Sequence, residues 1–290
     1  MILLRDILSR AAREHWATGH FNFSELDQAR AIVEACAEAR SPAILGTSES
    51  ERKHTGLTEA VAIRDAFRKD FTIPVFLNAD HTKSVTAAMA AVDAGYDSVH
   101  IDLSALPYEE NITGTQEIIK YARAQNPDIS IEGELGYLRG ESKIQHEKIA
   151  VKKEDYTDPA QAGDFVARTC VDRLAIAVGN IHGISLNEPD LDIPRIAAIR
   201  AVVPPEVALV LHAGSGIPDE QIRAAIATGI ANIHINTDIR VAYAESLKKS
   251  IGEHPDEVAM HKLDAPASAA MKEVIRQKLV LFGAVGKIDA

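Results

Sequence analysis

The chain is poor in the residues that cross-link proteins or anchor them in membranes. It has only two cysteines, Cys36 and Cys170, and their positions show no paired spacing. This excludes a disulfide framework or a thiolate zinc cluster as the organising feature. No uninterrupted apolar stretch approaches the roughly 20 residues of a membrane span. Charge interrupts the first six residues too soon for a signal peptide. We therefore expect a cytoplasmic protein with no membrane partner.

Basic charge is also scarce. The 290 residues include 31 Lys and Arg against 42 Asp and Glu, which gives a net charge of -11. Such a balance argues against a nucleic-acid partner, but a phosphate site can still be local. Because no internal repeat or linker-like segment interrupts the chain, we expect a single domain over residues 1–290.

Short apolar runs alternate with longer segments of helical spacing along the whole chain. We predict eight strands, at residues 18–23, 43–47, 73–78, 98–102, 129–134, 173–178, 208–212 and 232–236. Helices are predicted between them, among others at residues 24–39, 82–94 and 218–228. This order predicts an α/β fold, a single (β/α)8 TIM barrel, with residues 266–282 as a C-terminal helical extension. A doubly wound sheet is the alternative, but its G-x-G-x-x-G turn is missing after the first strand.

Polar and titratable residues follow the predicted strands. TIM barrels place their active sites at the carboxyl ends of the strands, and these ends carry Asp80, His81, Asp102, Ser104, Glu132, Glu134, His182, His212, Asn236, Thr237 and Asp238. Histidines after three separate strands, His81, His182 and His212, match an open catalytic zinc site with three protein ligands. A single histidine is more often structural, and we expect His20 and His100 to be interior residues. We expect His234 to be a polar wall residue of the pocket rather than a further ligand.

Glycine-rich turns add a second signal at the same edge of the barrel. Residues 178–183 and 212–216 follow the sixth and seventh strands, and Thr237 follows the eighth. Loops in these places commonly bind phosphate through backbone N–H groups. Gly214 and Ser215 fit such a role. Residues 136–159 are polar and charged, and we expect a mobile active-site lid there.

Taken together, these motifs resemble the class II, zinc-dependent fructose-bisphosphate aldolase or ketose-bisphosphate aldolase family. The matching segments follow the order of that family over nearly the whole chain: residues 19–22, 41–44, 47–49, 80–81, 101–104, 132–136, 182–183, 212–216, 270–273 and 282–283. The resemblance implies reversible aldol cleavage of a ketose bisphosphate, above all fructose 1,6-bisphosphate, to dihydroxyacetone phosphate and an aldehyde such as glyceraldehyde 3-phosphate. It also implies a homodimer or homotetramer.

The same resemblance assigns roles to individual residues. His81, His182 and His212 would bind Zn²⁺ or another divalent cation. Glu134 and Asp102 would form an auxiliary metal position. A monovalent cation could bind in addition. Asp80 would be the acid/base at the aldehyde oxygen, and Glu141 the second acid on the lid. Substrate and its phosphates would contact Asn22, Ser48, Gly183, Gly214, Ser215, His234, Asn236 and Thr237.

Three departures from the family pattern leave alternative functions open. Ala213 replaces a glycine, His234 replaces an asparagine, and Ser142 stands where the family's carboxylate would align. They allow an aldolase for tagatose bisphosphate or a deoxy-sugar phosphate, or a metal-retaining sugar-phosphate binding protein without turnover. A Schiff-base aldolase needs a lysine in a strand, and the predicted strands contain none. A metal-dependent hydrolase would need an H-x-H pair on the first strand, where only His20 is present. A purely structural oligomer would leave the ligand-type residues unexplained.

Overall fold

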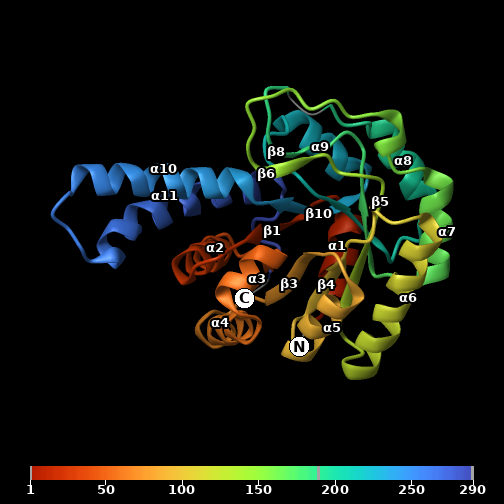
Figure 1. The fold of residues 1–290 in the computed structure, drawn as a ribbon, viewed down its shortest axis with the longest axis horizontal. Helices are drawn as coiled ribbons and strands as arrows, with labels where there is room; N and C mark the ends of the chain where they lie inside the picture. Colours follow the sequence, from red (N-terminus) through yellow and green to blue (C-terminus); the bar gives the residue numbers. More distant parts are fainter. Residues whose placement is uncertain (1, 188–189, 289–290) are drawn as a thin grey trace.

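The computed structural model describes residues 2–187 and 190–288, and its centre is a closed barrel of eight parallel strands (Figure 1). The strands run around the barrel in the order β1-β10-β9-β7-β5-β4-β3-β2. Their bounds are β1 Thr18–Asn22, β2 Ala43–Thr47, β3 Val75–Thr82, β4 Ser98–Ile101, β5 Ser130–Leu135, β7 Arg173–Ile176, β9 Ala208–Leu211 and β10 Ile230–Ile235. The predicted (β/α)8 barrel is confirmed.

Amphipathic helices surround the strands because each has one apolar face to bury. In the first helix, buried Leu4, Ile7, Leu8 and Ala11 recur at helical spacing. The helices are α1 Leu4–Glu14, α2 Leu26–Glu38, α3 Glu49–Thr55, α4 Leu57–Asp70, α5 Val85–Ala94, α6 Tyr108–Gln125, α7 Pro159–Thr169, α8 Ile193–Val202, α9 Asp219–Thr228, α10 Thr237–Glu253 and α11 Met260–Leu281. Among the described helices, none is long and apolar enough to cross a membrane.

Strand β3 differs most from its prediction, since it continues to Thr82 instead of ending at Asn78. Its pairing with β4 shifts between Ala79 and Thr82, which leaves one extra residue in β3. His81 lies in this bulge with a left-handed φ of 43°. The following helix starts later than predicted, at Val85, because the Ser84 side chain accepts a hydrogen bond from the backbone N–H of Ala87.

The segment predicted as an irregular lid contains regular structure. Strand β6 (Gly140–Ile144) pairs in parallel with β8 (His182–Ile184) outside the barrel, and a 3-10 turn follows at Lys153–Asp155. The prediction missed β6 because only backbone pairing with the distant β8, and no apolar pattern of its own, forms this strand. We call residues 137–157 the lid segment.

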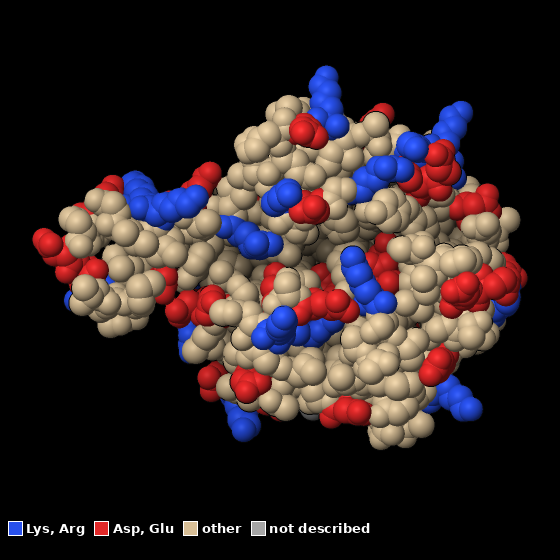
Figure 2. Space-filling model, in the orientation of Figure 1, with Lys and Arg blue, Asp and Glu red and all other residues tan. Residues whose placement is uncertain are grey.

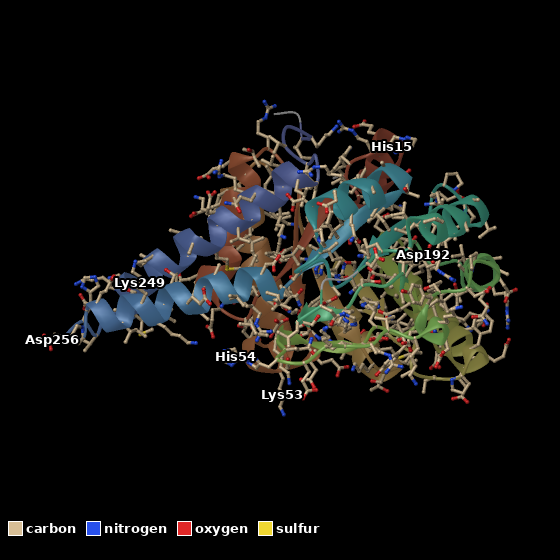
Figure 3. All side chains as sticks on the ribbon, turned by 90° about the horizontal axis from the view of Figure 1, so that it is seen from above. His15, Lys53, His54, Asp192, Lys249 and Asp256 are labelled. Carbon is tan, nitrogen blue, oxygen red and sulfur yellow. The ribbon has the colours of Figure 1, made fainter. Side chains whose placement is uncertain are left out.

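The last two helices form an arm that extends away from the barrel (Figures 1 and 3). They pack along each other, and Figure 3 shows Lys249 on α10 and Asp256 near the turn between them. The predicted start of the last helix at residue 266 is wrong: α11 begins at Met260 and continues through Pro266. Packing against α10 stabilises the turns before this proline, although a proline usually starts a helix.

The two faces of the barrel strands differ in polarity. Residues of alternate positions contact each other across the interior, as Arg173 of β7 does with Asn78 of β3 and His20 of β1 does with the same Asn78. The positions between them, such as Phe21 and Leu174, belong to the apolar core. The outer surface mixes acidic and basic side chains, with no continuous basic area on the face shown in Figure 2.

Candidate active site

The bulge in β3 is held open by a buried arginine. Arg52 of α3 donates to the carbonyl oxygens of Thr47 and Asp80 and, at 3.1 Å, to Oγ1 of Thr82. The backbone N–H of His81 donates to Nδ1 of His100 at 3.2 Å. These bonds satisfy the backbone groups that the bulge removes from the sheet. They turn Asp80 and His81 toward the same end of the barrel.

A ring nitrogen of His81 faces a ring nitrogen of His212 at this end of the barrel. His212 Nε2 donates to Glu132 Oε1 at 2.6 Å, and His81 Nδ1 donates to Asp102 Oδ2 at 2.9 Å, because a carboxylate only accepts hydrogen bonds. The remaining nitrogens, His212 Nδ1 and His81 Nε2, lie 3.0 Å apart. Two lone pairs at this distance would repel, so a proton or a cation lies between them. In the metal-free chain a proton on His81 is favoured, because burial, which lowers the pKa of His81, is outweighed by Asp80 and the hydrogen bond to Asp102, which raise that pKa.

This donor set fits a divalent metal ion. Histidines that bind metals commonly donate their second nitrogen to a carboxylate, which fixes the tautomer. Ligand-type atoms lie within 4.8 Å of one another in two sets that contain His81, one of Asp80, His81, His100 and His212 and the other of His81, Asp102 and Glu134. Imidazole and carboxylate ligands suit zinc.

The third predicted ligand, His182, lies next to this pair on β8. Its ring centroid is 4.9 Å from that of His81. Burial, followed by the neighbouring charge of His81, lowers the pKa of His182 from 6.5 to about 3. The imidazole is therefore neutral at physiological pH and keeps a lone pair for a metal.

Hydrogen-bond donors surround the carboxylate of Asp80 beside the histidines. Asn22 Nδ2 donates to its Oδ2 at 3.0 Å and His234 Nδ1 to its Oδ1 at 3.2 Å. Burial alone would raise the pKa of Asp80, but His81, His100 and His234 hold that pKa well below its usual range. The carboxylate is therefore ionised.

His234 lies in the wall of the narrow cavity beside Asp80. Its ring stacks on that of His20, with centroids 3.6 Å apart, and its Nε2 lies 3.1 Å from Asn232 Oδ1. Burial, with His212 beside it, lowers the pKa of His234 to about 3. The imidazole of His20 also packs directly against Gly46, where an added Cβ would collide with it.

A buried ion pair supports the site from below, and the sequence reasoning missed it. Arg173 Nη1 lies 2.7 Å from Glu132 Oε2, both side chains are fully buried, and Arg173 Nη2 donates to Asn78 Oδ1 at 3.0 Å. Glu132 in turn holds His212. A signal was present, since polar residues recur at every second position of β5 at Ser130, Glu132 and Glu134, and Asn232 and His234 do so in β10.

The predicted phosphate residues lie at the start of α10 and in the turn after β9. Thr237 is the first residue of α10, and Ser215 Oγ accepts from the N–H of Asp238 at 3.2 Å. The predicted Gly183 has a φ of 85°, and a Cβ there would collide with carbonyl oxygens of the lid segment. Ala213 takes a left-handed φ of 56° where a glycine would be unstrained.

A narrow cavity of about 20 Å³ collects most of the predicted residues. Its walls are Asn22, Asp80, His81, Ser142, His182, Gly183, His212, Ala213, Ser215, His234, Asn236 and Thr237. Gly214 lies behind this wall, where its N–H donates to the carbonyl oxygen of His234. The other predicted residues, Ser48, Asp102, Glu134 and Glu141, line an adjoining chamber of about 580 Å³. Glu141 is 73% exposed and forms an ion pair with Lys143 at 2.8 Å.

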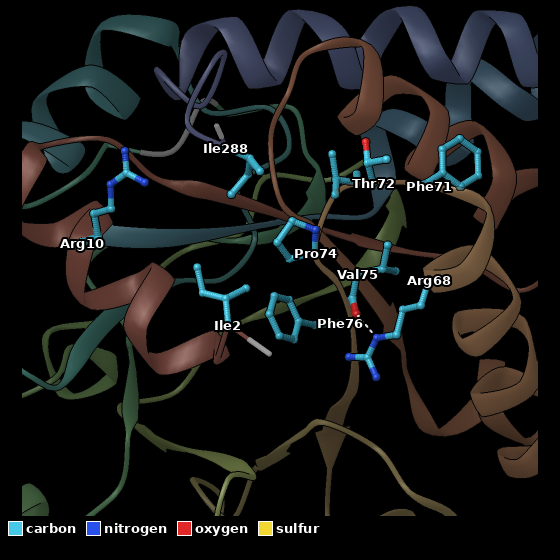
Figure 4. Close-up of a pocket in the computed structure, with 10 residues that line it drawn as sticks. Ile2, Arg10, Arg68, Phe71, Thr72, Pro74, Val75, Phe76 and Ile288 are labelled. Carbon is cyan, nitrogen blue, oxygen red and sulfur yellow. Dashed lines mark hydrogen bonds between the residues drawn. The ribbon is translucent and has the colours of Figure 1, made fainter. Parts of the chain in front are cut away.

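A third cavity, of about 530 Å³, lies at the opposite end of the barrel, against the beginning of β3 (Figure 4). Its walls are mostly apolar, with Phe71, Pro74 and Phe76 among them. The guanidinium of Arg68 is already engaged, since its Nε donates to the carbonyl oxygen of Val75 at 2.7 Å. This cleft offers no carboxylate or imidazole among its described walls, so the chemistry lies at the carboxyl end of the strands.

Comparisons with known proteins relate this chain to aldolases. A family model described as "Fructose-bisphosphate aldolase class-II" matches residues 3–287. A protein of Geobacillus stearothermophilus named fructose-bisphosphate aldolase is 34% identical over 290 residues, which cover 99% of this chain and 98% of that protein. The crystal structure of the YdjI aldolase from Escherichia coli K12 superposes with a TM-score of 0.84 at 32% identity, covering 99% and 98% of the two chains. A putative fructose-1,6-bisphosphate aldolase from Coccidioides immitis has the same fold, with a TM-score of 0.86 at 24% identity and coverage of 98% and 97%.

Proposed function

This chain belongs to the class II fructose-bisphosphate aldolase family, as its motifs predicted, and is thus a lyase; we propose that it catalyses reversible, metal-dependent aldol cleavage of a ketose phosphate to dihydroxyacetone phosphate and an aldehyde. The observation that carries this proposal is the pair of facing ring nitrogens of His81 and His212, 3.0 Å apart, next to an ionised Asp80. A cation site and a proton acceptor in contact are what this reaction needs.

In this proposal His81, His182 and His212 hold a divalent cation, for which zinc is the first candidate. The cation would stabilise the negative charge that develops on the ketone oxygen during cleavage. Asp102 and Glu134 would form the auxiliary position. Asp102 also orients His81, and Glu132 orients His212, so that both rings direct a lone pair to the same point.

Asp80 would move the proton of the aldehyde half. When the C3–C4 bond of the ketose breaks, its electron pair stays on C3, and the C4 hydroxyl becomes a carbonyl as its proton passes to Asp80. Hydrogen bonds from Asn22 and His234 keep the acceptor oxygens in place. The carbanion at C3 is then protonated, for which Glu141 of the lid segment is the candidate acid.

The phosphate on C1 would bind at the amino end of α10. Thr237 and Ser215 offer hydroxyl groups there, and the positive end of the backbone dipole of this 17-residue helix favours an anion. Gly183 and Gly214 allow a close approach of the backbone, and Asn236 and His234 complete the wall. Asn22 and Ser48 would face the remainder of the sugar.

The test combines metal removal with an assay for dihydroxyacetone phosphate, using fructose 1,6-bisphosphate as the reference substrate beside tagatose and deoxy-sugar phosphates. We expect cleavage that a chelator abolishes and Zn²⁺ restores. Borohydride should trap no covalent adduct, because the mechanism uses no Schiff base. Cleavage that is unchanged in a fully metal-free protein would refute the assignment.

We further propose that the single 1–290 domain assembles as a homodimer or homotetramer through the α10–α11 arm, and that it is cytoplasmic. The arm supports this because Val258 and Met260 near its tip are exposed apolar residues. Light scattering of the full chain and of a Val258→Lys, Met260→Lys variant would test it, with a smaller particle expected for the variant.

A further inference from the structure

The two cavities of the site divide the substrate into two halves. His81 and His182 line both the narrow cavity and the adjoining chamber, so both cavities meet at the proposed metal ligands. The narrow cavity ends at α10, where the phosphate of the ketone half would bind. The chamber of about 580 Å³ is therefore the place for the aldehyde half.

The charges of this chamber do not suit a phosphate. Among its described walls, Lys83 is the one Lys or Arg, whereas four carboxylates line it: Glu49, Asp102, Glu134 and Glu141. Glu141 is paired with Lys143, and Asp102 and Glu134 belong to the proposed auxiliary metal position, so Glu49 is the carboxylate that decides the charge beside Lys83. Glu49 lies close to the lysine, since its Oε1 accepts from the backbone N–H of Lys83 at 2.9 Å. A phosphate dianion near Lys83 would therefore also lie near Glu49.

The turn before α3 offers the chamber no free anion site either. The N–H of Ser48 already donates to Glu51 Oε2 at 2.7 Å. Glu49 and Glu51 occupy the first turn of this short helix, where acidic side chains already complement the positive end of the backbone dipole. A second anion at this place would meet carboxylates first.

The uncharged part of the chamber wall suits a hydroxylated carbon chain. Leu106 and Tyr137, which are 44% and 47% exposed, give its edge an apolar stretch. The hydroxyl groups of Ser48, Ser50 and Ser104 line the same space. Apolar surface with a few hydroxyl partners is the composition of a site for a neutral sugar chain.

We propose that the aldehyde partner of this enzyme is an unphosphorylated polyhydroxy aldehyde, so that its substrates are ketose 1-phosphates rather than ketose 1,6-bisphosphates. The proposal rests on the aldolase function given above. It deepens that function, because it decides which half of the sugar carries the only phosphate the site holds.

The experiment is the synthesis reaction of the metal-loaded full chain with dihydroxyacetone phosphate and matched aldehydes. D-glyceraldehyde is compared with D-glyceraldehyde 3-phosphate, and the L-enantiomers likewise, so that each pair differs only in one phosphate. We expect kcat/KM to be at least about tenfold higher for the unphosphorylated aldehyde of each pair, because the carboxylates of the chamber repel the phosphate of the other aldehyde. Raising the salt from about 0.05 to 0.5 M should narrow the difference, since salt screens the repulsion.

A charge variant tests the cause of the preference. Glu49→Gln should raise kcat/KM for the phosphorylated aldehyde about threefold. The ratio of kcat/KM between the unphosphorylated and the phosphorylated aldehyde then becomes smaller. Glu117→Gln, on the exposed surface of α6, is the matched control and should leave the ratio unchanged. If the Glu49 variant does not fold, the salt series on the unchanged protein decides the same point.

The outcomes separate the two proposals. Equal or better use of the phosphorylated aldehydes would overturn this inference and leave the aldolase function standing. A preference that salt and Glu49→Gln both leave unchanged would overturn its electrostatic cause. If the metal-loaded protein joins dihydroxyacetone phosphate to no aldehyde of either kind, the proposed function itself fails.

Discussion

The inner and outer faces of the same eight strands are built from different residues for different purposes. The outer face packs against the helices with Ile, Leu, Val and Phe, which supply the apolar burial that holds the barrel closed. The inner face carries imidazole, carboxylate, amide and guanidinium groups that bond across the barrel. Adjacent residues of one strand thus serve either stability or chemistry.

This difference has a physical cost. Buried polar groups are tolerated only when they have partners, and the inner face meets this condition through contacts between paired strands and across the barrel. Arg173 of β7 contacts Glu132 of the paired strand β5, and Glu132 accepts a hydrogen bond from His212, so this chain of contacts ends at the proposed metal site. The following predictions test this separation of roles between the two faces, from the largest expected effect to the smallest.

His212→Ala should abolish metal retention and aldolase activity while the barrel remains folded, because it removes one of the two facing nitrogens. Its neighbour on the outer face gives the matched control. Leu211→Ala should keep the metal but lower the free energy of unfolding by about 2–5 kcal/mol. Metal analysis and denaturant unfolding of both variants measure this. A His212→Ala protein that retains one metal ion per chain would remove the ligand assignment.

Asp80→Asn should keep the metal but lower turnover by about 10²–10⁴-fold, since the amide cannot accept the proton of the C4 hydroxyl. Hydrogen bonds from Asn22 and His234 surround this side chain, so little movement of the backbone is expected. Steady-state kinetics together with metal content provide the measurement. A rate near that of the unchanged protein would move the proton transfer to another group.

Arg173→Met should lower the free energy of unfolding by about 3–5 kcal/mol, because it leaves the carboxylate of Glu132 buried without its partner. The double variant Arg173→Met, Glu132→Gln removes both charges and should lose clearly less. Denaturant unfolding of the two proteins gives the comparison. A double variant that loses as much stability as Arg173→Met would show that the unpaired charge of Glu132 is not the cause of the loss.

Acid should destabilise the metal-free protein partly through His234. Its pKa is about 3 in the folded chain and near 6.5 when unfolded, so between these values the unfolded chain binds a proton that the folded chain does not. His234 therefore costs no stability above pH 6.5, and it lowers the free energy of unfolding as the pH falls from 6.5 toward 3. This loss is about 2 kcal/mol at pH 5. In His234→Asn the decrease in stability between pH 6.5 and 5 should be smaller by that amount. Equal decreases would contradict the burial of a neutral ring.

Ala213→Gly should raise the free energy of unfolding by about 1 kcal/mol, because glycine adopts the left-handed φ of 56° without strain. Thermal and denaturant unfolding of the apo protein measure the gain. A loss of stability would mean that the methyl group contributes more by packing than it costs in strain.

Much of the fold was predictable because its signals are local. The alternation of apolar runs and helical segments identified all eight strands, and Gly95 and Gly229 marked the ends of two helices. Histidines at the ends of separate strands pointed to one edge of the barrel. The family motifs indicated the reaction.

The remainder could not be predicted because distant residues create it. The bulge at His81 depends on Arg52 and on pairing with β4, which no local pattern reveals. Strand β6 exists through its pairing with β8. The contact of Arg173 with Glu132 depends on the pairing of β5 with β7, so the polar residues of these strands signalled a polar face but not which side chains meet.

Helix α10 starts in the wall of the narrow cavity and ends far out along the arm. Its 17 residues form a rod of about 25 Å, without a break among the residues described. A tilt of about 5° at the amino end would displace the far end by about 2 Å over such a length. A contact that holds the distal half of α10 consequently also fixes the orientation of its first turn in the narrow cavity.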